Sequence, residues 1–252
     1  MCNICVKLDN QFIKSFDEQL AFLSELNINN IEIDDYIDNL YLINMNGEQI
    51  EKYRNILIKY NKKIVLINSS ISLDNISDYH LLFRKAHLLK AESIRLHFDS
   101  NCIDTLLFEK VEEILKMGKS YNIWCMIENN AHLFNADALM QTQLFSKYKE
   151  YHLGLIYNAL EVVKQKRHPF FHVFYNGRFK NNIQFLRIND GLFSDGSPIM
   201  IGNGNAEIKE LISALLARNY KGYFSIEPYL APCDVNDIIM TLDIFKKTLM
   251  EI

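Results

Sequence analysis

Two glutamates occupy positions at which acid–base chemistry could take place. Glu128 closes the apolar run Ile123-Trp-Cys-Met-Ile, and Glu227 closes the run Tyr223-Phe-Ser-Ile. A carboxylate at the end of a buried segment needs a cation, a metal or a shared proton to offset its loss of water. Two carboxylates that face one substrate can act as acid and base on opposite faces of a carbon. We therefore expect Glu128 and Glu227 to act together, with loop capping as the alternative role for each.

Other polar residues close or follow apolar runs in the same way. They are His97, Asn158, Arg187, Asn189 and Asp190. These residue types are rarely buried in an apolar core, so we treat them as candidates for the same site. For His97, a structural role with its ring hydrogen-bonded is an equally good interpretation.

The apolar runs themselves indicate the scaffold. They begin at residues 31, 64, 93, 123, 153, 183 and 223, so most successive starts lie close to 30 residues apart, and Cys5-Val-Lys-Leu would make an eighth. Apolar residues at helical spacing lie between them, which predicts helices over 16–26, 50–60, 76–89, 103–117, 136–148, 208–216 and 235–249. Strand and helix repeated at this period predict a single (β/α)8 barrel over residues 1–252. The site of such a barrel lies where the carboxyl ends of the strands converge.

Two segments could instead bind phosphate. The segment from Leu160 to Asn182 is the least regular part of the chain, and it contains the basic run Lys164-Gln-Lys-Arg-His before Pro169. We expect this run to be a solvated loop, with a phosphate-facing role as the alternative, and Pro169 can start a helix. The turn Gly202-Asn-Gly204 lacks the third glycine of a dinucleotide-binding loop, so a strand-to-helix turn is the favoured interpretation.

The amino-acid composition and net charge limit the kinds of molecule that this protein is expected to bind. The net charge of −4 provides no general field that would attract nucleic acid. No apolar stretch approaches the roughly 20 residues of a membrane span, and the polar start lacks the pattern of a signal peptide. We therefore expect a cytoplasmic protein with a small-molecule substrate and no nucleic-acid or membrane partner. A homodimer is one alternative for its assembly.

The closing part of the chain resembles a known superfamily. The stretch Ile201-Gly-Asn-Gly-Asn-Ala-Glu, followed by Asn219-Tyr-Lys-Gly-Tyr-Phe-Ser-Ile-Glu, is similar to the last unit of the xylose isomerase-like barrels. That superfamily includes sugar isomerases, epimerases and endonuclease-IV-type enzymes. Met126-Ile-Glu-Asn-Asn also resembles its fifth strand. The resemblance implies a TIM barrel that acts on a sugar or sugar acid.

The resemblance also implies a divalent metal, but the chain departs from the expected ligand set. The family holds its metal with Glu, Asp, His and Glu after strands 5 to 8. Glu128 and Glu227 match the glutamates, whereas Asn158 and Arg187 occupy the two middle positions, with Asn189-Asp190 as the counterpart of the family's Lys-Asp. A guanidinium beside the metal position repels a divalent ion. We therefore expect Arg187 to bridge the glutamates or to clamp an anionic substrate group, with the metal weak or absent.

A metal site remains the alternative, with Glu128, Glu227 and Asn158 as ligands of Mn, Mg, Co or Zn. On the metal-free interpretation, the chain is an isomerase or epimerase in which Glu128 and Glu227 transfer protons and Arg187 stabilises the enediolate. His97, Asn158, Asn189 and Asp190 would bind substrate, and Trp124 could stack on a sugar ring, although packing explains Trp124 as well.

Two further functions are alternatives to the isomerase. The first is a non-catalytic ligand-binding barrel that has lost its metal site. The second, an endonuclease-IV-like nuclease, is disfavoured because the chain reads Asn158-Ala-Leu-Glu where that group has a further histidine.

Overall fold

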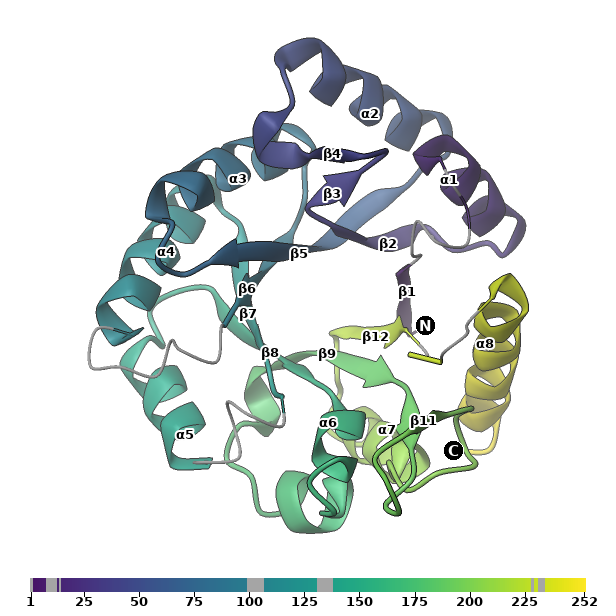
Figure 1. The fold of residues 1–252 in the computed structure, drawn as a ribbon. Coiled ribbons are helices and arrows are strands. Elements are labelled where there is room, and N and C mark those ends of the chain that lie inside the picture. Colours follow the sequence, from purple (N-terminus) through teal and green to yellow (C-terminus); the bar gives the residue numbers. More distant parts are fainter. Residues whose placement is uncertain are drawn as a thin grey trace. The chain divides into compact units, whose positions relative to one another are not determined.

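The computed structural model describes residues 2–7, 13, 15–98, 107–130, 138–227, 229–230 and 234–252, without the side chains of 138–142. Eight parallel strands form a closed barrel in the order β1-β12-β9-β8-β7-β6-β5-β2 (Figure 1). The barrel strands are β1 (Asn3–Lys7), β2 (Asn30–Asp34), β5 (Lys63–Ser72), β6 (Ser93–His97), β7 (Trp124–Glu128), β8 (Leu153–Tyr157), β9 (Ile183–Ile188) and β12 (Tyr223–Ile226). The predicted (β/α)8 barrel is thereby confirmed.

Helices follow the strands as the apolar spacing predicts. The α-helices are α1 (Phe16–Glu25), α2 (Gly47–Lys59), α3 (Ile76–Leu88), α4 (Leu107–Tyr121), α5 (Ala138–Lys147), α6 (Ala159–Val163), α7 (Ile208–Leu216) and α8 (Val235–Met250). The starts predicted at 103 and 136 lie outside the described residues. In α7 the buried residues Ile208, Leu211, Ile212 and Leu215 form one apolar stripe.

Two short hairpins and three short helical segments complete the described elements. The hairpins pair β3 (Tyr36–Ile37) with β4 (Leu40–Tyr41) and β10 (Asp190–Gly191) with β11 (Pro198–Ile199). The short helical segments are η1 (Leu42–Asn44), the π-helix η2 (Pro169–Phe174) and η3 (Lys180–Asn182). Pro169 stands in the first turn of η2, as expected of a residue that can start a helix.

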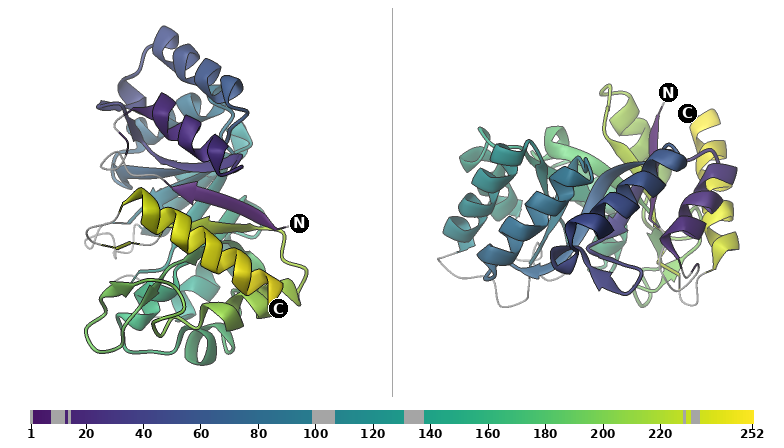
Figure 2. Two further views of the ribbon diagram at one scale, coloured as in Figure 1. Left: turned by 90° about the vertical axis from the view of Figure 1, so that its right-hand side faces the viewer. Right: turned by 90° about the horizontal axis from the view of Figure 1, so that it is seen from above.

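The chain divides into two compact units. The first unit comprises Met1–Ile4, Glu128–Gln143 and Leu155–Ile252, and the second comprises Cys5–Ile127 and Leu144–Gly154. In the second unit, α3 packs against α4 and β5. In the first unit, α8 packs against β12 (Figure 2), and η2 packs against α6 and α7. Among the described helices, none is long and apolar enough to cross a membrane.

Candidate functional site

Arg187 is the centre of the polar cluster in the first unit. It lies in β9, where its register partner on the neighbouring strand β12 is Ser225. The guanidinium is fully buried, with 0% of the side chain exposed. The small side chain of Ser225 leaves room for it, and Arg187 Nη1 donates to Ser225 Oγ at 2.8 Å. A long cationic side chain is buried here because neighbouring strands provide it with partners.

The two glutamates of the sequence prediction meet at this guanidinium. Arg187 Nε and Nη2 donate to Glu128 Oε1 and Oε2 at 3.0 and 3.2 Å. On the other side, Nη1 lies 3.1 Å from Glu227 Oε2. The Glu128 and Glu227 side chains are only 9% and 13% exposed. The bridge that the sequence offered as one alternative for Arg187 is therefore present, and the bidentate pairing with Glu128 fixes the plane of the guanidinium.

A ladder of buried asparagines supports Glu128. Asn158 Nδ2 donates to Glu128 Oε1 at 3.0 Å, and Asn158 Oδ1 accepts from Asn189 Nδ2 at 3.1 Å. Asn129 holds the backbone of Asn158 from both sides, because its Oδ1 accepts the N–H at 2.6 Å and its Nδ2 donates to the carbonyl at 2.8 Å. Asn158 and Asn189 thus lie in the cluster, where they position a carboxylate.

Asp190 has a different environment. Its Oδ1 accepts from the N–H groups of Gly191 and Ala206, each at 2.8 Å, and its Oδ2 accepts from those of Gly202 and Gly204 at 2.9 and 3.0 Å. The Gly202-Asn-Gly204 turn therefore binds an anion, but the anion is a side chain of the same chain. An added Cβ at Gly204 would overlap the Asp190 carboxylate, so the close approach requires glycine there. Four backbone donors make Asp190 a structural residue and leave it poorly placed for substrate.

His97 and Trp124 belong to the second unit. His97 is the last residue of β6, and its N–H donates to the Tyr79 hydroxyl at 3.2 Å. Trp124 is the first residue of β7, and its ring stacks on His152 with 5.0 Å between centroids. The expectation that Trp124 flanks the carboxyl ends of the strands is wrong, because it starts the strand that Glu128 ends. Packing against His152 explains its position.

The residues of the cluster do not fit the four-ligand metal site of the resembled family. The guanidinium of Arg187 lies between Glu128 and Glu227 and opposes a divalent ion there. Asn158 Oδ1, the predicted amide ligand, accepts from Asn189 instead. Within the described part of the chain, no group of three or more His, Cys, Asp and Glu residues could hold a metal.

Sequence reasoning missed one residue of this cluster, Ser225. Ser225 stands two residues before Glu227 in an otherwise apolar run, and alternate strand residues share a face, so its role was detectable. Asn129 follows Glu128 directly, but nothing in its neighbours indicates that its amide pairs with the backbone of Asn158.

The second unit has its own buried carboxylates. Asn68 Nδ2 donates to Glu32 Oε1 at 2.8 Å, and Asp35 accepts from the N–H and Oγ of Ser70 at 2.7 and 3.0 Å. Burial raises the pKa of Asp35 above its ordinary value, and the hydrogen bonds from Ser70 oppose that shift. Glu32 escaped the sequence analysis because it lies inside the run Ile31-Glu-Ile rather than at its end.

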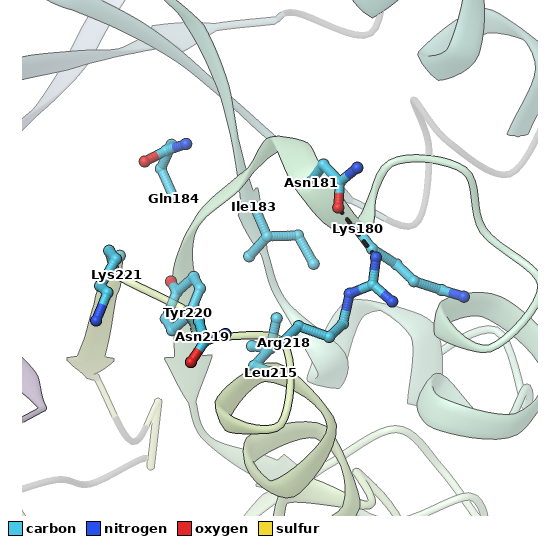
Figure 3. Close-up of a pocket in the computed structure, with 10 residues that line it drawn as sticks. Lys180, Asn181, Ile183, Gln184, Leu215, Arg218, Asn219, Tyr220 and Lys221 are labelled. Atoms are coloured by element: carbon cyan, nitrogen blue, oxygen red, sulfur yellow. Dashed lines mark hydrogen bonds between the residues drawn. The ribbon is translucent and has the colours of Figure 1, made fainter.

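A separate cavity of 210 Å³ in the first unit lies at the amino ends of β9 and β12 (Figure 3). At its edge Arg218 Nη2 donates to Asn181 Oδ1 at 3.0 Å, as the dashed line in Figure 3 marks, and Lys180 Nζ donates to the Tyr175 carbonyl at 2.6 Å. Arg187 lies near the opposite end of β9. This cavity is therefore not part of the polar cluster.

Solved structures with the same fold cover nearly the whole chain. A xylose isomerase domain protein from Planctomyces limnophilus has a TM-score of 0.79 and 11% identity, over 100% of this chain and 98% of that one. A D-tagatose 3-epimerase-like protein has a TM-score of 0.75 and 18% identity, over 98% and 97%. A xylose isomerase-like TIM barrel protein from Mycobacterium smegmatis, solved in complex with magnesium, has a TM-score of 0.74 and 17% identity, over 99% and 96%.

Sequence comparisons add no closer relative, since no family model and no curated protein matches the chain. At identities this low, structural similarity establishes the fold and leaves the activity open. The resemblance noted at the closing strands is confirmed at that level: the chain has the fold of the xylose isomerase-like TIM barrels.

Proposed function

We propose that this chain is a sugar isomerase or epimerase-like protein that transfers a proton at the carbon beside the carbonyl of a small polyhydroxylated substrate. The observation that carries the proposal is the double ion pair of one buried arginine, Arg187, with Glu128 and Glu227. Two carboxylates and one cation are the groups that enolisation needs. The shared fold with a D-tagatose 3-epimerase-like protein supports the class of substrate.

The geometry favours different roles for the two glutamates. Glu128 accepts from Arg187 Nε and Nη2 and from Asn158 Nδ2, so it orients the guanidinium. Glu227 has the more exposed side chain, so we assign it the role of the base that substrate reaches. Glu227 would take the proton, the C–H electron pair would form the new C=C bond, and the π pair of the C=O bond would move to the carbonyl oxygen. The charge of Arg187 would stabilise the resulting enediolate before the proton returns.

Replacement of Glu227 by Gln tests this role. Glu227→Gln keeps the shape of the side chain and removes the base, so turnover of a responsive sugar should fall by about 10²–10⁴-fold. The assay is a chromatographic screen of keto sugars, aldoses, inositols and sugar acids. Glu251→Gln is the matched control, since Glu251 is an exposed partner of Lys209 on the surface. Full activity in Glu227→Gln protein with an unchanged melting temperature would remove the proton-transfer role.

The weak-metal part of the proposal has its own test. Elemental analysis of protein purified without chelator should find Mn, Mg, Co and Zn well below one ion per chain, because the guanidinium of Arg187 lies between the two glutamates and repels a divalent ion. A stoichiometric ion whose removal abolishes activity would overturn this part.

The second candidate is a non-catalytic ligand-binding barrel. It is favoured by the same salt bridge, because a guanidinium held by two glutamates can serve structure alone. Ligand-dependent rises in melting temperature without conversion of any compound in the screen would favour this candidate over the enzyme.

A further inference from the structure

The basic run before Pro169 contains two exposed cations, Lys166 and Arg167, that have no ion pair with a described residue. Lys164 Nζ pairs with Glu161 at 2.5 Å, and His168 Nδ1 lies 3.0 Å from Glu207 Oε1. Arg167 has no ion pair with any residue that the structure describes, and its side chain is exposed. The run is therefore only partly a neutralised surface loop, and Arg167 needs a separate explanation.

Arg167 lines a cavity of 100 Å³ in the first unit. Its polar walls come from Asn129, Gln165, Arg167, His172 and Asn176, and its apolar walls include Tyr157. Among the described residues, no Asp or Glu lines it. A single water needs about 10–15 Å³ on a comparable measure, so the cavity has room for a group of several heavy atoms.

Two of the lining side chains, Arg167 and His172, carry N–H groups that can donate to a ligand. His172 Nδ1 accepts from the His168 N–H at 3.2 Å, which puts the ring proton of the neutral imidazole on Nε2. The Tyr157 hydroxyl donates to the Pro169 carbonyl at 2.8 Å, so this phenol is already used by the fold. Burial raises the pKa of the Tyr157 phenol, the charge of Glu207 raises it further, and the charge of Arg167 opposes both. One guanidinium and one imidazole N–H beside amide groups suit an anion.

The same cavity adjoins the Arg187 cluster through Asn129. Asn129 follows Glu128 in the chain, so their Cα atoms are about 3.8 Å apart. Its side chain holds the backbone of Asn158, whose own amide donates to Glu128. Asn129 thus lines the cavity and also holds Asn158, which donates to Glu128.

We propose that this cavity is the subsite for an anionic group, a phosphate ester or a carboxylate, on the substrate of the Arg187 cluster. The proposal rests on the proposed function and narrows its substrate class to sugar phosphates or sugar acids. Arg167 is the specificity-determining residue, because its planar guanidinium can pair with two oxygens of either group.

Calorimetric titration tests the subsite without requiring turnover. The probes are inorganic phosphate, a ketose phosphate, an aldonic acid and the neutral ketose, and the ketose phosphate and aldonic acid distinguish the two anionic groups. The preferred anionic sugar should bind at least about tenfold more tightly than the neutral one, and Arg167→Gln should abolish that preference. Lys166→Gln is the matched control, because Lys166 is the neighbouring exposed cation and does not line the cavity. It should change affinity by less than about twofold.

Glu227→Gln separates this proposal from the proposed function. Anion binding that depends on Arg167 and persists in Glu227→Gln protein supports the subsite, even if no compound is converted. Equal affinity of wild-type and Arg167→Gln proteins for all four probes overturns the subsite, even if a neutral sugar is converted.

Discussion

Two buried anionic sites in the first unit stabilise their carboxylates by different means. At Arg187, a side-chain cation pairs with Glu128 and Glu227. Three residues further along the chain, Asp190 accepts from four backbone N–H groups, three of them in the glycine-containing turn from Gly202 to Ala206. Both sites lie at or just after the carboxyl end of β9, and both contain residues that the sequence marked as functional.

The two sites differ in whether the partners of the carboxylates can also bind a substrate. Three of the four N–H groups around Asp190 belong to the turn from Gly202 to Ala206 and the fourth to Gly191, so the carboxylate fixes that turn and is occupied by the backbone. The partners of Arg187 are side chains at the end of β7 and in or just after β12, which can exchange a contact for a substrate group. Position at a strand end therefore does not establish a role in chemistry, whereas the kind of partner helps to decide it.

The largest change in stability is expected when the cation at the first of these sites is removed. Arg187→Met should lower the free energy of unfolding by about 3–5 kcal/mol, because it leaves two carboxylates buried without their partner. Chemical denaturation monitored by circular dichroism measures the change. Arg218→Met is the control, since Arg218 lies at the surface near the other end of β9, and it should change stability by less than about 0.5 kcal/mol. A loss no larger than that of the control would show that the bridge adds little to stability.

A smaller effect is expected at the Asp190 turn. Asp190→Asn places an NH₂ group against two of the four backbone donors, so it should lower the free energy of unfolding by about 2–3 kcal/mol. Asp195→Asn provides the same substitution at an exposed site nearby, where Asp195 accepts from the Ser197 N–H at 2.9 Å. If the two variants were equally stable in denaturant, the structural assignment of Asp190 would be wrong.

The smallest effect concerns the pH dependence contributed by a third carboxylate, Asp35. Burial raises its pKa in the folded state, so the folded protein holds the proton more tightly than the unfolded chain does. The stability of wild type relative to Asp35→Asn should therefore be greatest below the unfolded pKa of about 3.9 and should fall as pH rises through the higher folded pKa.

The size and sign of this effect can be checked by thermal denaturation at several pH values. Each unit between the folded and unfolded pKa corresponds to about 1.4 kcal/mol. Hydrogen bonds from Ser197 lower the pKa of Asp195, so the Asp195→Asn comparison should show the opposite slope with pH. The same slope at both positions would contradict the role of burial.

The fold could be predicted from the sequence because its signal is local and repeated. Apolar runs near 30 residues apart, separated by apolar stripes at helical spacing, led to all eight barrel strands and to helices such as α3 and α7 within a few residues. The hairpins β3–β4 and β10–β11 were not predicted, since two-residue strands are too short to carry a periodic pattern.

The candidate site was predictable only in part. A glutamate at the end of an apolar run identified Glu128 and Glu227, and an arginine in the same position identified Arg187. The sequence could not distinguish Asp190 from these residues, because all of them follow strands. It also placed Trp124 at the wrong end of β7, since a strand's apolar pattern does not show which of its residues lies near a ligand.

By itself the sequence determined a (β/α)8 barrel with polar residues at the ends of its strands, because period and burial are properties of neighbouring residues. Only the tertiary structure decided that Arg187 lies between two glutamates and that the Gly202-Asn-Gly204 turn is filled by Asp190. Those facts depend on distances between residues far apart in the chain, such as the 59 positions from Glu128 to Arg187. Such distances set the charge balance of a site. The roles of Arg187 and the two glutamates could therefore be inferred only from the tertiary structure, which brings their charges together.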